Sequence, residues 1–169
     1  MSKKSFSLIH FDFDIGTLQL IPTYHESYKI CESCSKSVLK KDLSIKKEQF
    51  KNIFLKILIP KIKPLQQFPT KNEIFIFIIQ YFASKNDYKS QDLDNMAKTI
   101  LDILKGQFYE SDGQVRVLLM LKKMTDNRIP QNYAYIAVKE LVDDRDIDII
   151  KAAGIERSVT YYQQSFKTS

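Results

Sequence analysis

The chain has 169 residues, of which 44% are hydrophobic and 27% are charged, as in ordinary globular proteins. This length suits one compact domain, and four glycines and five prolines exclude collagen-like or low-complexity architecture. No stretch approaches the roughly 20 uncharged apolar residues that a membrane span needs, and the apolar run near the start is too short for a signal peptide. We therefore expect no membrane association and, with only two cysteines, a reducing cytoplasm.

Positive charge is concentrated in the first half of the chain. The 26 Lys and Arg residues exceed the 20 Asp and Glu residues and give a formal net charge of +6. Residues 1–89 hold 15 lysines and 8 acids, whereas residues 90–169 hold 11 basic and 12 acidic residues. A basic half beside an acid-dotted half is typical of a protein that attracts a polyanion and places carboxylates against it. Lysines that only keep the surface solvated are the alternative.

The first part of the chain predicts a strand, a loop-rich stretch and a basic helix. Residues 5–14 alternate with the period of two that is typical of a strand. Residues 15–45 have no such period and include both cysteines. Residues 46–63 carry apolar side chains at helical spacing among six lysines, and we expect Pro60 to kink or end this helix and Pro64 to close it.

The middle of the chain predicts a buried strand and a second helix. Residues 73–83 are almost wholly apolar and β-branched or aromatic, which is typical of a central strand buried on both faces. A polar loop, residues 84–91, precedes a strong helix over residues 93–105. Gly106 stands where a helix C-terminal cap is expected. The apolar stripe of this helix is predicted to contain Leu93, Ala97, Ile100, Leu101 and Leu104.

The last part predicts two strands, residues 115–124 and 133–142, joined by residues 125–132 as a hairpin loop. An acidic run then opens a short helix over 143–154, followed by a tail or partner-docking segment. The order strand, helix, strand, helix, strand, strand predicts an α/β (α+β) fold, a single domain with a small mixed sheet flanked by two main helices. We assign residues 1–142 to this domain and 143–169 to the C-terminal helix and tail.

Three carboxylates and a lysine carry the candidate chemistry. Asp92 and Asp94 stand where the loop after the buried strand meets the second helix, and Asp112 stands just before the next strand. If that strand pairs beside the buried one, the three carboxylates converge at one edge of the sheet. Clustered carboxylates bind Mg²⁺, which can polarise a phosphodiester and generate hydroxide, while Lys98 offsets the developing charge.

Each of these residues also has a structural explanation. Asp92 or Asp94 suits a helix N-cap, and Asp112 in Ser-Asp-Gly suits a turn. Asp94, Lys98 and Asp102, spaced four residues apart, suit an exposed ladder of ion pairs. The D-x-D spacing alone does not decide between a site and these alternatives.

The whole pattern resembles the signature of RusA-type Holliday-junction resolvases. Their D-L-D-N-x-x-K-x-x-x-D-x-L-x-G segment followed by D-x-Q-V is matched by Asp92-Leu93-Asp94-Asn95, Lys98, Asp102, Leu104, Gly106, Asp112, Gln114 and Val115. The strands around this motif extend the resemblance, more loosely, to about residues 70–142. One position departs from it, because the family usually has a pair of acids before x-Q-V and the first of that pair is Ser111 here. If that first acid mattered more, Glu110 would have to replace it.

The resemblance implies a small homodimeric endonuclease that depends on Mg²⁺, or Mn²⁺ in its place, and nicks four-way DNA junctions symmetrically in recombination and repair. By motif position, Asp92, Asp94 and Asp112 are the catalytic, metal-binding carboxylates and Lys98 is the catalytic lysine. Asn95 and Asp102 are in supporting positions. A twofold protein suits this substrate, since a junction has two equivalent scissile phosphates related by a twofold axis. The alternatives are a non-catalytic branched-DNA binding module, and a general metal-dependent nuclease that acts on flaps or single strands.

Two further features bear on partners and cofactors. Cys31-Glu-Ser-Cys34 forms a C-x-x-C with no second pair, which favours two reduced thiols over a Zn²⁺ site completed by a histidine or a second subunit. The resemblance places the protein in the cytoplasm of a bacterial cell or a phage-infected host. Candidates for contacts with the DNA backbone are Lys47, Lys51, Lys122, Lys123 and Arg128.

Overall fold

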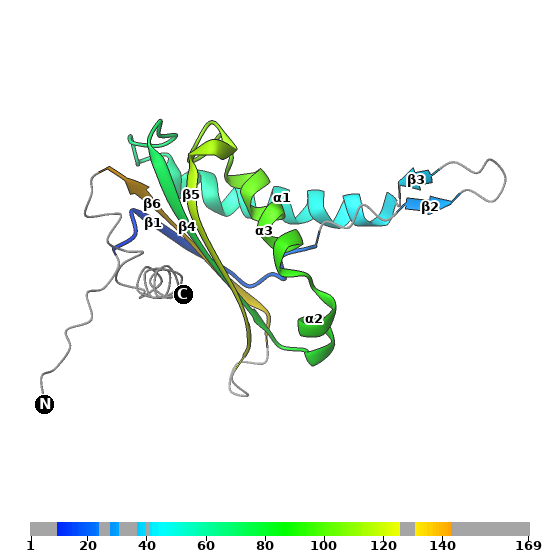
Figure 1. Ribbon diagram of the computed structural model, residues 1–169. Coiled ribbons are helices and arrows are strands. Elements are labelled where there is room, and N and C mark those ends of the chain that lie inside the picture. The colour runs from blue at the N-terminus through cyan, green and yellow to red at the C-terminus, as the bar shows by residue number, and fades with distance from the viewer. Residues whose placement is uncertain (1–9, 24–27, 31–36, 40, 126–130, 143–169) are drawn as a thin grey trace, which may run out of the picture.

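A four-stranded mixed sheet with helices packed on one face forms the centre of the molecule (Figure 1). The computed structural model describes residues 10–23, 28–30, 37–39, 41–125 and 131–142. The elements in chain order are β1 (Phe13–Thr17), β2 (Tyr28–Ile30), β3 (Ser37–Leu39), α1 (Lys41–Ile62), β4 (Glu73–Phe82), α2 (Lys85–Ser90), α3 (Leu93–Leu104), the 3₁₀ helix η1 (Asp112–Gln114), β5 (Val115–Met124) and β6 (Tyr133–Leu141). The predicted fold class, a small mixed sheet with two main helices, is confirmed.

The strand β4 lies inside the sheet, whose order is β1-β6-β4-β5. It pairs in parallel with β5 and antiparallel with β6. Ile76 and Ile78, which face the helices, are fully buried, and Phe75 on the opposite face is only 3% exposed. The prediction of a central strand buried on both faces is therefore confirmed, as its near-continuous apolar sequence suggested.

The strands β5 and β6 are not hairpin partners, which corrects the sequence-based expectation. β4 lies between them, so the connection through residues 125–132 joins strands that are not neighbours. A period of two identifies strands but does not say which strands pair. Here β5 pairs with β4 through the parallel crossover that contains α3, and this pairing leaves β6 to the other side of β4.

Several element boundaries also differ from the prediction. β1 begins at Phe13, whereas the alternating pattern covers residues 5–14, of which 1–9 lie outside the described residues. The loop-rich stretch 15–45 contains a small two-stranded ribbon, β2 with β3, as well as the start of α1. The loop 84–91 contains α2, whose N-cap Ser84 accepts hydrogen bonds from the N–H groups of the helix's second and third residues.

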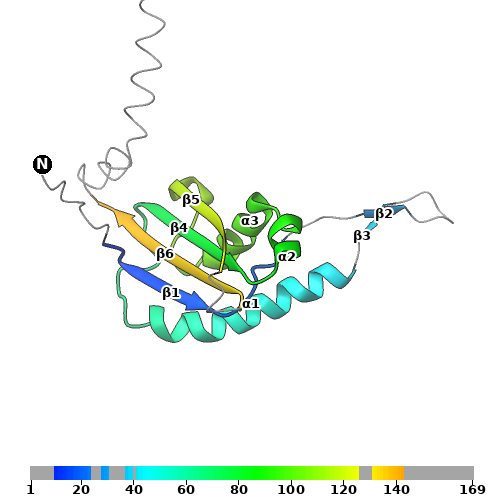
Figure 2. The same ribbon diagram turned by 90° about the horizontal axis from the view of Figure 1, so that it is seen from below.

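The helix α1 is longer than predicted and continues past Pro60 to Ile62, so this proline does not end it. Pro60 lies in the last turn of α1, two residues before the helix ends, and it cannot donate the hydrogen bond that other residues of the helix make to the carbonyl four residues earlier. Phe50, Phe54 and Leu58 recur every four residues along α1 and are buried against the sheet. Figure 2 shows α1 and α3 on the same side of the sheet, with the β2–β3 ribbon beyond the N-terminal end of α1.

The apolar face of α3 differs from the predicted stripe at its start. Leu93 is 40% exposed, and Met96 and Ile103 are buried in its place along with Ile100 and Leu104. Gly106 follows the helix with φ of +79°, the left-handed conformation that the C-terminal cap prediction required. The start of α3 therefore projects away from the core, together with its flanking carboxylates.

Part of the prediction falls on residues that the structure does not describe. These are the short helix 143–154 and the tail after it, Cys31 and Cys34, and Arg128. Within the described residues, none of the helices combines the length and the apolar character that a membrane crossing requires.

Candidate active site

Asp92 and Asp94 lie at the N-terminal end of α3. Asp92 occupies the N-cap position in extended backbone, and its carbonyl accepts a hydrogen bond from the Met96 N–H at 3.2 Å. Among the described residues its carboxylate makes no capping hydrogen bond and instead accepts one from Asn95 Nδ2 at 3.3 Å. Asp94 lies in the first turn and is exposed. The helix dipole favours negative charge here, but capping does not account for the Asp92 carboxylate.

One exposed face of α3 carries the residues at spacing four. Lys98 lies one turn after Asp94 and is exposed, and Asp102 lies one turn further. Asp102 does not simply extend an ion-pair ladder along the helix, because its Oδ2 contacts Lys47 Nζ of α1 at 2.7 Å. The side chain of Lys47 is only 21% exposed in this contact. Asp102 therefore ties α3 to α1, and Lys47, a predicted DNA contact, takes part in that tie.

The chain just before Asp92 is held by two contacts. The Gln91 N–H donates to the Asp87 carbonyl at 3.0 Å, and the Gln91 carbonyl accepts a hydrogen bond from Lys122 Nζ of β5. The same ammonium lies 4.8 Å from the Tyr88 ring centroid, within the range of a cation–π contact. Lys122 is thus partly buried in a structural role, whereas Lys123, the next predicted DNA contact, is exposed.

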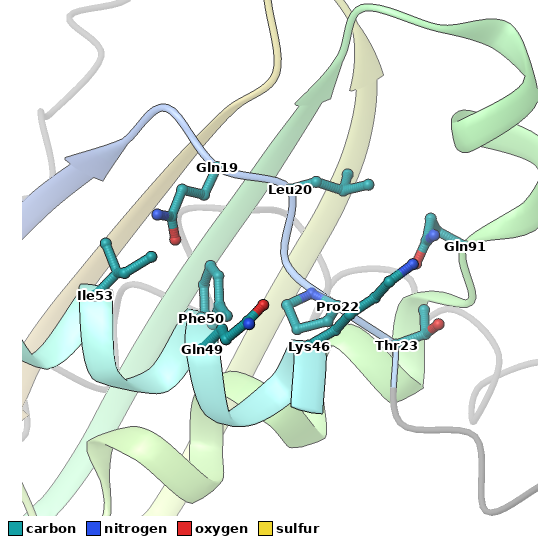
Figure 3. Close-up of a pocket in the computed structure, with 9 residues that line it drawn as sticks. All are labelled: Gln19, Leu20, Pro22, Thr23, Lys46, Gln49, Phe50, Ile53 and Gln91. Carbon is teal, nitrogen blue, oxygen red and sulfur yellow. The ribbon is translucent and has the colours of Figure 1, made fainter. Parts of the chain in front are cut away.

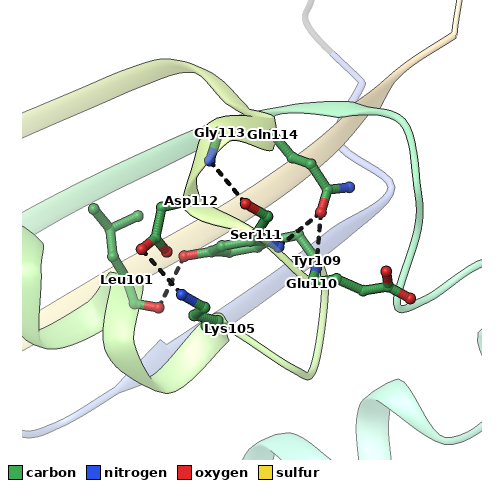
Figure 4. A network of polar contacts seen from close by, with 8 residues as sticks. All are labelled: Leu101, Lys105, Tyr109, Glu110, Ser111, Asp112, Gly113 and Gln114. Atoms are coloured by element: carbon green, nitrogen blue, oxygen red, sulfur yellow. Dashed lines mark hydrogen bonds and ion pairs between the residues drawn. The ribbon is translucent and has the colours of Figure 1, made fainter.

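Asp112 lies at the opposite end of α3, in a loop that a hydrogen-bonded network holds in place (Figure 4). Ser111 is the N-cap of η1 and accepts a hydrogen bond from the Gly113 N–H, and Gln114 Oε1 accepts the Ser111 and Glu110 N–H groups at 2.9 Å. Gln114 Nε2 in turn donates to the Thr70 carbonyl at 2.8 Å. The Gln of D-x-Q-V is therefore a structural residue, and Ser111 fills a cap position that an aspartate also suits.

The carboxylate of Asp112 is 73% exposed and contacts Lys105 Nζ at 3.0 Å. Beneath it Tyr109 is fully buried, and its hydroxyl donates to the Leu101 carbonyl at 2.9 Å. Burial raises the pKa of Tyr109 well above its ordinary value, and the Asp112 and Asp102 carboxylates raise this pKa further. Sequence reasoning missed Tyr109, since a tyrosine in the loop after α3 carried no pattern that distinguished it.

The two ends of α3 are well separated, so the predicted convergence of the three carboxylates is wrong within one chain. Lys122 of β5 bonds to Gln91 beside Asp92, whereas Asp112 precedes Val115 at the other end of the same strand. Seven residues of extended chain span about 23 Å. A parallel β4–β5 pair requires α3 to run the full length of the strands between them, which places its start and the start of β5 at opposite edges. Within the described residues, no group of three or more His, Cys, Asp or Glu side chains is placed to hold a metal ion.

Comparison with known families identifies the family of this chain. A model of the family described as endodeoxyribonuclease RusA matches residues 34–132, more than half of the chain. The chain belongs to the RusA family. The protein is accordingly an endodeoxyribonuclease of the Holliday-junction resolvase class. The RusA match begins well before the motif-based resemblance at residue 70 and includes the basic helix α1. A search of the curated proteins finds none that matches this chain.

The start of α3 suits Mg²⁺ by the chemistry of its donors. Asp92 and Asp94 are both exposed and offer carboxylate oxygens, and Mg²⁺ typically takes one or two protein carboxylates while waters and phosphate oxygens complete its shell. Two carboxylates therefore fit a metal that is shared with a phosphate. Asp112 of the same chain lies too far away to join them, so a third carboxylate would have to come from elsewhere.

Proposed function

We propose that this RusA-family protein is a homodimeric, Mg²⁺-dependent resolvase that nicks four-way DNA junctions in symmetric pairs. Mn²⁺ would substitute for Mg²⁺. The observation that carries the proposal is the start of α3, where Asp92 and Asp94 are exposed and the Asp92 carboxylate takes no part in capping the helix. Lys98 follows one turn later on the same face as Asp94. We expect such an enzyme to act in the cytoplasm of a bacterial cell or phage-infected host.

We propose a separate role for each of the residues at the start of α3. Asp92 and Asp94 would hold the metal, which would polarise the phosphodiester and provide a hydroxide nucleophile near neutral pH. The Lys98 ammonium would stabilise the negative charge that develops on the phosphate oxygens. Asn95 orients the Asp92 carboxylate through the hydrogen bond from its Nδ2, which gives it a positioning role.

A second copy of the chain can supply the missing carboxylate. β5 is an edge strand, and Leu118, Leu119 and Leu121 on it are 40%, 43% and 43% exposed. A long apolar edge strand favours pairing with another strand. A twofold axis near the middle of β5 exchanges the two ends of the strand. It would thus bring the Asp112 end of one copy to the Asp92 end of the other.

Mixing two inactive variants tests this arrangement. Asp94→Asn and Asp112→Asn are each expected to abolish junction cleavage. In a mixed dimer, one of the two sites would combine an intact Asp94 from one chain with an intact Asp112 from the other. We therefore expect co-refolded variants to regain nicking of one strand per junction.

Mixing two preparations of Asp94→Asn alone is the matched control and should stay inactive. If the Asp94→Asn and Asp112→Asn mixture also stays inactive while mass spectrometry shows mixed dimers, the shared site is excluded.

Parallel assays on a four-way junction, a flap and a linear duplex, with Mg²⁺ or EDTA, address the alternative functions. Equal rates on all three substrates would favour a general nuclease. Tight junction binding without any cleavage would favour a non-catalytic binding module.

The lysines that we propose as DNA contacts differ in how exposed they are and in whether they already contact other protein groups. Lys123 is exposed and Lys51 is partly exposed, so both are available to phosphate oxygens. Lys47 and Lys122 contact other protein groups, which limits their reach. Contacts of this kind carry affinity but no sequence information, so their removal should weaken binding to all junctions alike.

A further inference from the structure

Lys122 of β5 holds the residue that precedes the candidate metal ligands. Its Nζ donates a hydrogen bond to the Gln91 carbonyl, and Gln91 is followed directly by Asp92. The same ammonium lies 4.8 Å from the Tyr88 ring centroid and 5.6 Å from the Phe82 ring centroid. Both distances are within the range of cation–π contacts, so two rings and one carbonyl hold this lysine in place.

The sheet gives this anchor a fixed position. Lys122 pairs with Gln80 of β4, in the register that also pairs Ile78 with Met120. Paired residues share a face of the sheet, so Lys122 lies on the face that packs against the helices. Gln80 is fully buried, and its side chain makes hydrogen bonds to the backbone of β6 and of the segment after β1. The Gln91 carbonyl is therefore tied to the sheet and not to a surface loop.

Gln91 is held by its backbone and not by its side chain. The Gln91 N–H donates to the Asp87 carbonyl at 3.0 Å, at the end of α2. The side chain lines a cavity of about 360 Å³ beside α1 (Figure 3). Its Oε1 is buried there and has no hydrogen-bond partner among the described residues. The orientation of the peptide between Gln91 and Asp92 therefore depends on Lys122.

This peptide restricts the direction in which Asp92 leaves the chain. A peptide unit is planar and includes the Cα atoms on both sides, so a fixed Gln91 carbonyl restricts the position of the Asp92 Cα. Asp92 is the N-cap of α3, but within the described residues its carboxylate makes no capping hydrogen bond to the helix. The Asn95 amide contacts this carboxylate directly, and the peptide held by Lys122 fixes the Cα from which it projects.

Packing alone does not account for a lysine at this position. The Lys122 side chain is partly buried, and among the described residues its ammonium takes part in no ion pair. Desolvation of a charge destabilises the folded state unless protein groups replace the lost water, so an apolar residue would pack better against Phe82 and Tyr88. The lysine adds a hydrogen-bond donor at the end of a long side chain, and this donor contacts the Gln91 carbonyl.

We propose that Lys122 is a positioning residue of the metal site. Its ammonium fixes the peptide between Gln91 and Asp92, and this peptide fixes the direction of one of the two carboxylates at the start of α3. The proposal rests on the proposed function, because these carboxylates are the ones that would hold Mg²⁺. Residues that orient metal ligands affect metal affinity even though they do not contact the metal.

Binding of Mn²⁺ to the DNA-free protein tests this role without relying on cleavage. Lys122→Met keeps the length of the side chain but loses the donor, and we expect the Kd for Mn²⁺ to rise at least about tenfold. Electron paramagnetic resonance of free Mn²⁺ measures this Kd. Electrostatics alone predicts the opposite sign, because loss of a nearby ammonium removes repulsion of the cation. Equal or tighter Mn²⁺ binding by Lys122→Met would overturn the proposal.

Two further lysine variants serve as controls. Lys122→Arg keeps a cationic donor that can contact the same carbonyl and rings, so it should restore most of the lost Mn²⁺ affinity. Lys123 pairs with Tyr81 on the opposite face of the sheet and is exposed, so Lys123→Met should bind Mn²⁺ like wild type.

The salt dependence of junction binding in EDTA distinguishes positioning from a DNA contact. Loss of one phosphate contact lowers the slope of log Kd against log salt concentration by about one. Lys122→Met should keep the wild-type slope, because this lysine acts on the protein backbone. A slope that is lower by about one in Lys122→Met would identify a DNA contact and contradict the positioning role.

The Tm of the metal-free protein and the variant Asp94→Asn separate the remaining outcomes. A lysine with a merely structural role would lower the Tm and leave the Mn²⁺ affinity of the folded protein unchanged. If Lys122→Met does not fold, Tyr88→Leu removes one of the rings at the ammonium and should weaken Mn²⁺ binding; unchanged binding there would refute the proposal. If Asp94→Asn loses Mn²⁺ binding and Lys122→Met does not, only the role of Lys122 is refuted. Normal Mn²⁺ binding and cleavage by Asp94→Asn would refute the proposed function itself.

Discussion

The two ends of α3 differ in how their acidic residues are used. At the N-terminal end, Asp92 and Asp94 are both exposed. The Gln91 carbonyl before them accepts a hydrogen bond from Lys122, and the Asp92 carboxylate accepts one from Asn95 without capping the helix. At the other end Asp112 contacts Lys105, within a loop that Gln114 holds closed. The first end carries two exposed carboxylates. The second end is a rigid platform that presents a single carboxylate.

The largest expected effect separates acids that act on DNA from an acid that supports the fold. Asp94→Asn should reduce junction cleavage in Mg²⁺ by at least about a hundredfold, because a metal ligand is lost. Junction binding should stay equal or become tighter, since a charge that repels phosphate is removed. Cleavage and gel-shift assays on one synthetic junction measure both quantities. Asp102→Asn, on the same face of α3, is the control and should keep most of the activity. Normal cleavage by Asp94→Asn would show that this end of α3 is not the site.

The next effect tests whether the Asp112 end is a rigid platform. Gln114→Ala removes acceptors for two N–H groups and donors to the loop before β4, which should cost about 1–3 kcal/mol of unfolding free energy. Urea unfolding measures the loss, and Gln66→Ala, an exposed glutamine after α1, is the comparison. Cleavage should fall with the loosened loop even under conditions where the variant is folded. Full stability of Gln114→Ala would mean that the loop does not depend on this side chain.

Much of the fold could be predicted because its signals are local. The almost wholly apolar run over residues 73–83 identified β4, and the period of α3 and Gly106 identified the helix and its end. Pairing is not local. The predicted hairpin between β5 and β6 was wrong because the neighbours of a strand depend on which crossover packs best. The wrong prediction for Leu93, which is exposed, has a similar cause. Helical spacing shows which residues share a face of α3 but not how far along the helix that face is covered by the core.

The same distinction applies to the site. The motif predicted which residue types are candidates for the chemistry, and Asp92 and Asp94 both lie at the start of α3 because they are two residues apart in the sequence. The position of Asp112 depends on the direction of β5 relative to β4, which no residue in the motif specifies. The buried Tyr109 also carried no sequence signal, because a single polar residue acquires its environment only on folding.

A smaller effect concerns the proton on Tyr109 beneath the Asp112 platform. The pKa of this tyrosine is raised in the folded protein, so above pH 10 the unfolded chain loses protons that the folded chain keeps. Stability that is present below pH 10 is therefore lost as the pH rises. Tyr135, whose pKa burial and Asp14 raise to about 12, adds to the same loss.

The variant Tyr109→Phe isolates this effect. It loses the hydrogen bond to the Leu101 carbonyl, worth about 1 kcal/mol, and should lower the Tm by about 2–4 °C at pH 8. The difference in Tm between this variant and wild type should become smaller between pH 10 and pH 11. Only wild type has a tyrosine at this position, so only wild type loses the stability linked to its ionisation. Tyr135→Phe provides the comparison from the other side of the sheet. A deficit that grows with pH would contradict the assigned direction of the shift.

The smallest effect concerns the ion pair between Lys47 of α1 and Asp102 of α3. Lys47 and Asp102 are in contact at 2.7 Å, but with the Asp102 side chain 48% exposed, the pair should contribute no more than about 1 kcal/mol. Lys47→Met should therefore shift the urea midpoint only slightly, and the shift should disappear at high salt. If Lys47 also bound DNA, Lys47→Met would weaken junction binding and Asp102→Asn would strengthen it by freeing the lysine. Loss of the Asp102 charge also removes repulsion of phosphate, so the effect of Asp102→Asn has to be compared in two backgrounds. If Lys47 binds DNA, Asp102→Asn should strengthen junction binding more in wild type than in Lys47→Met. If the role of Lys47 is only structural, Asp102→Asn should change binding by the same factor in both.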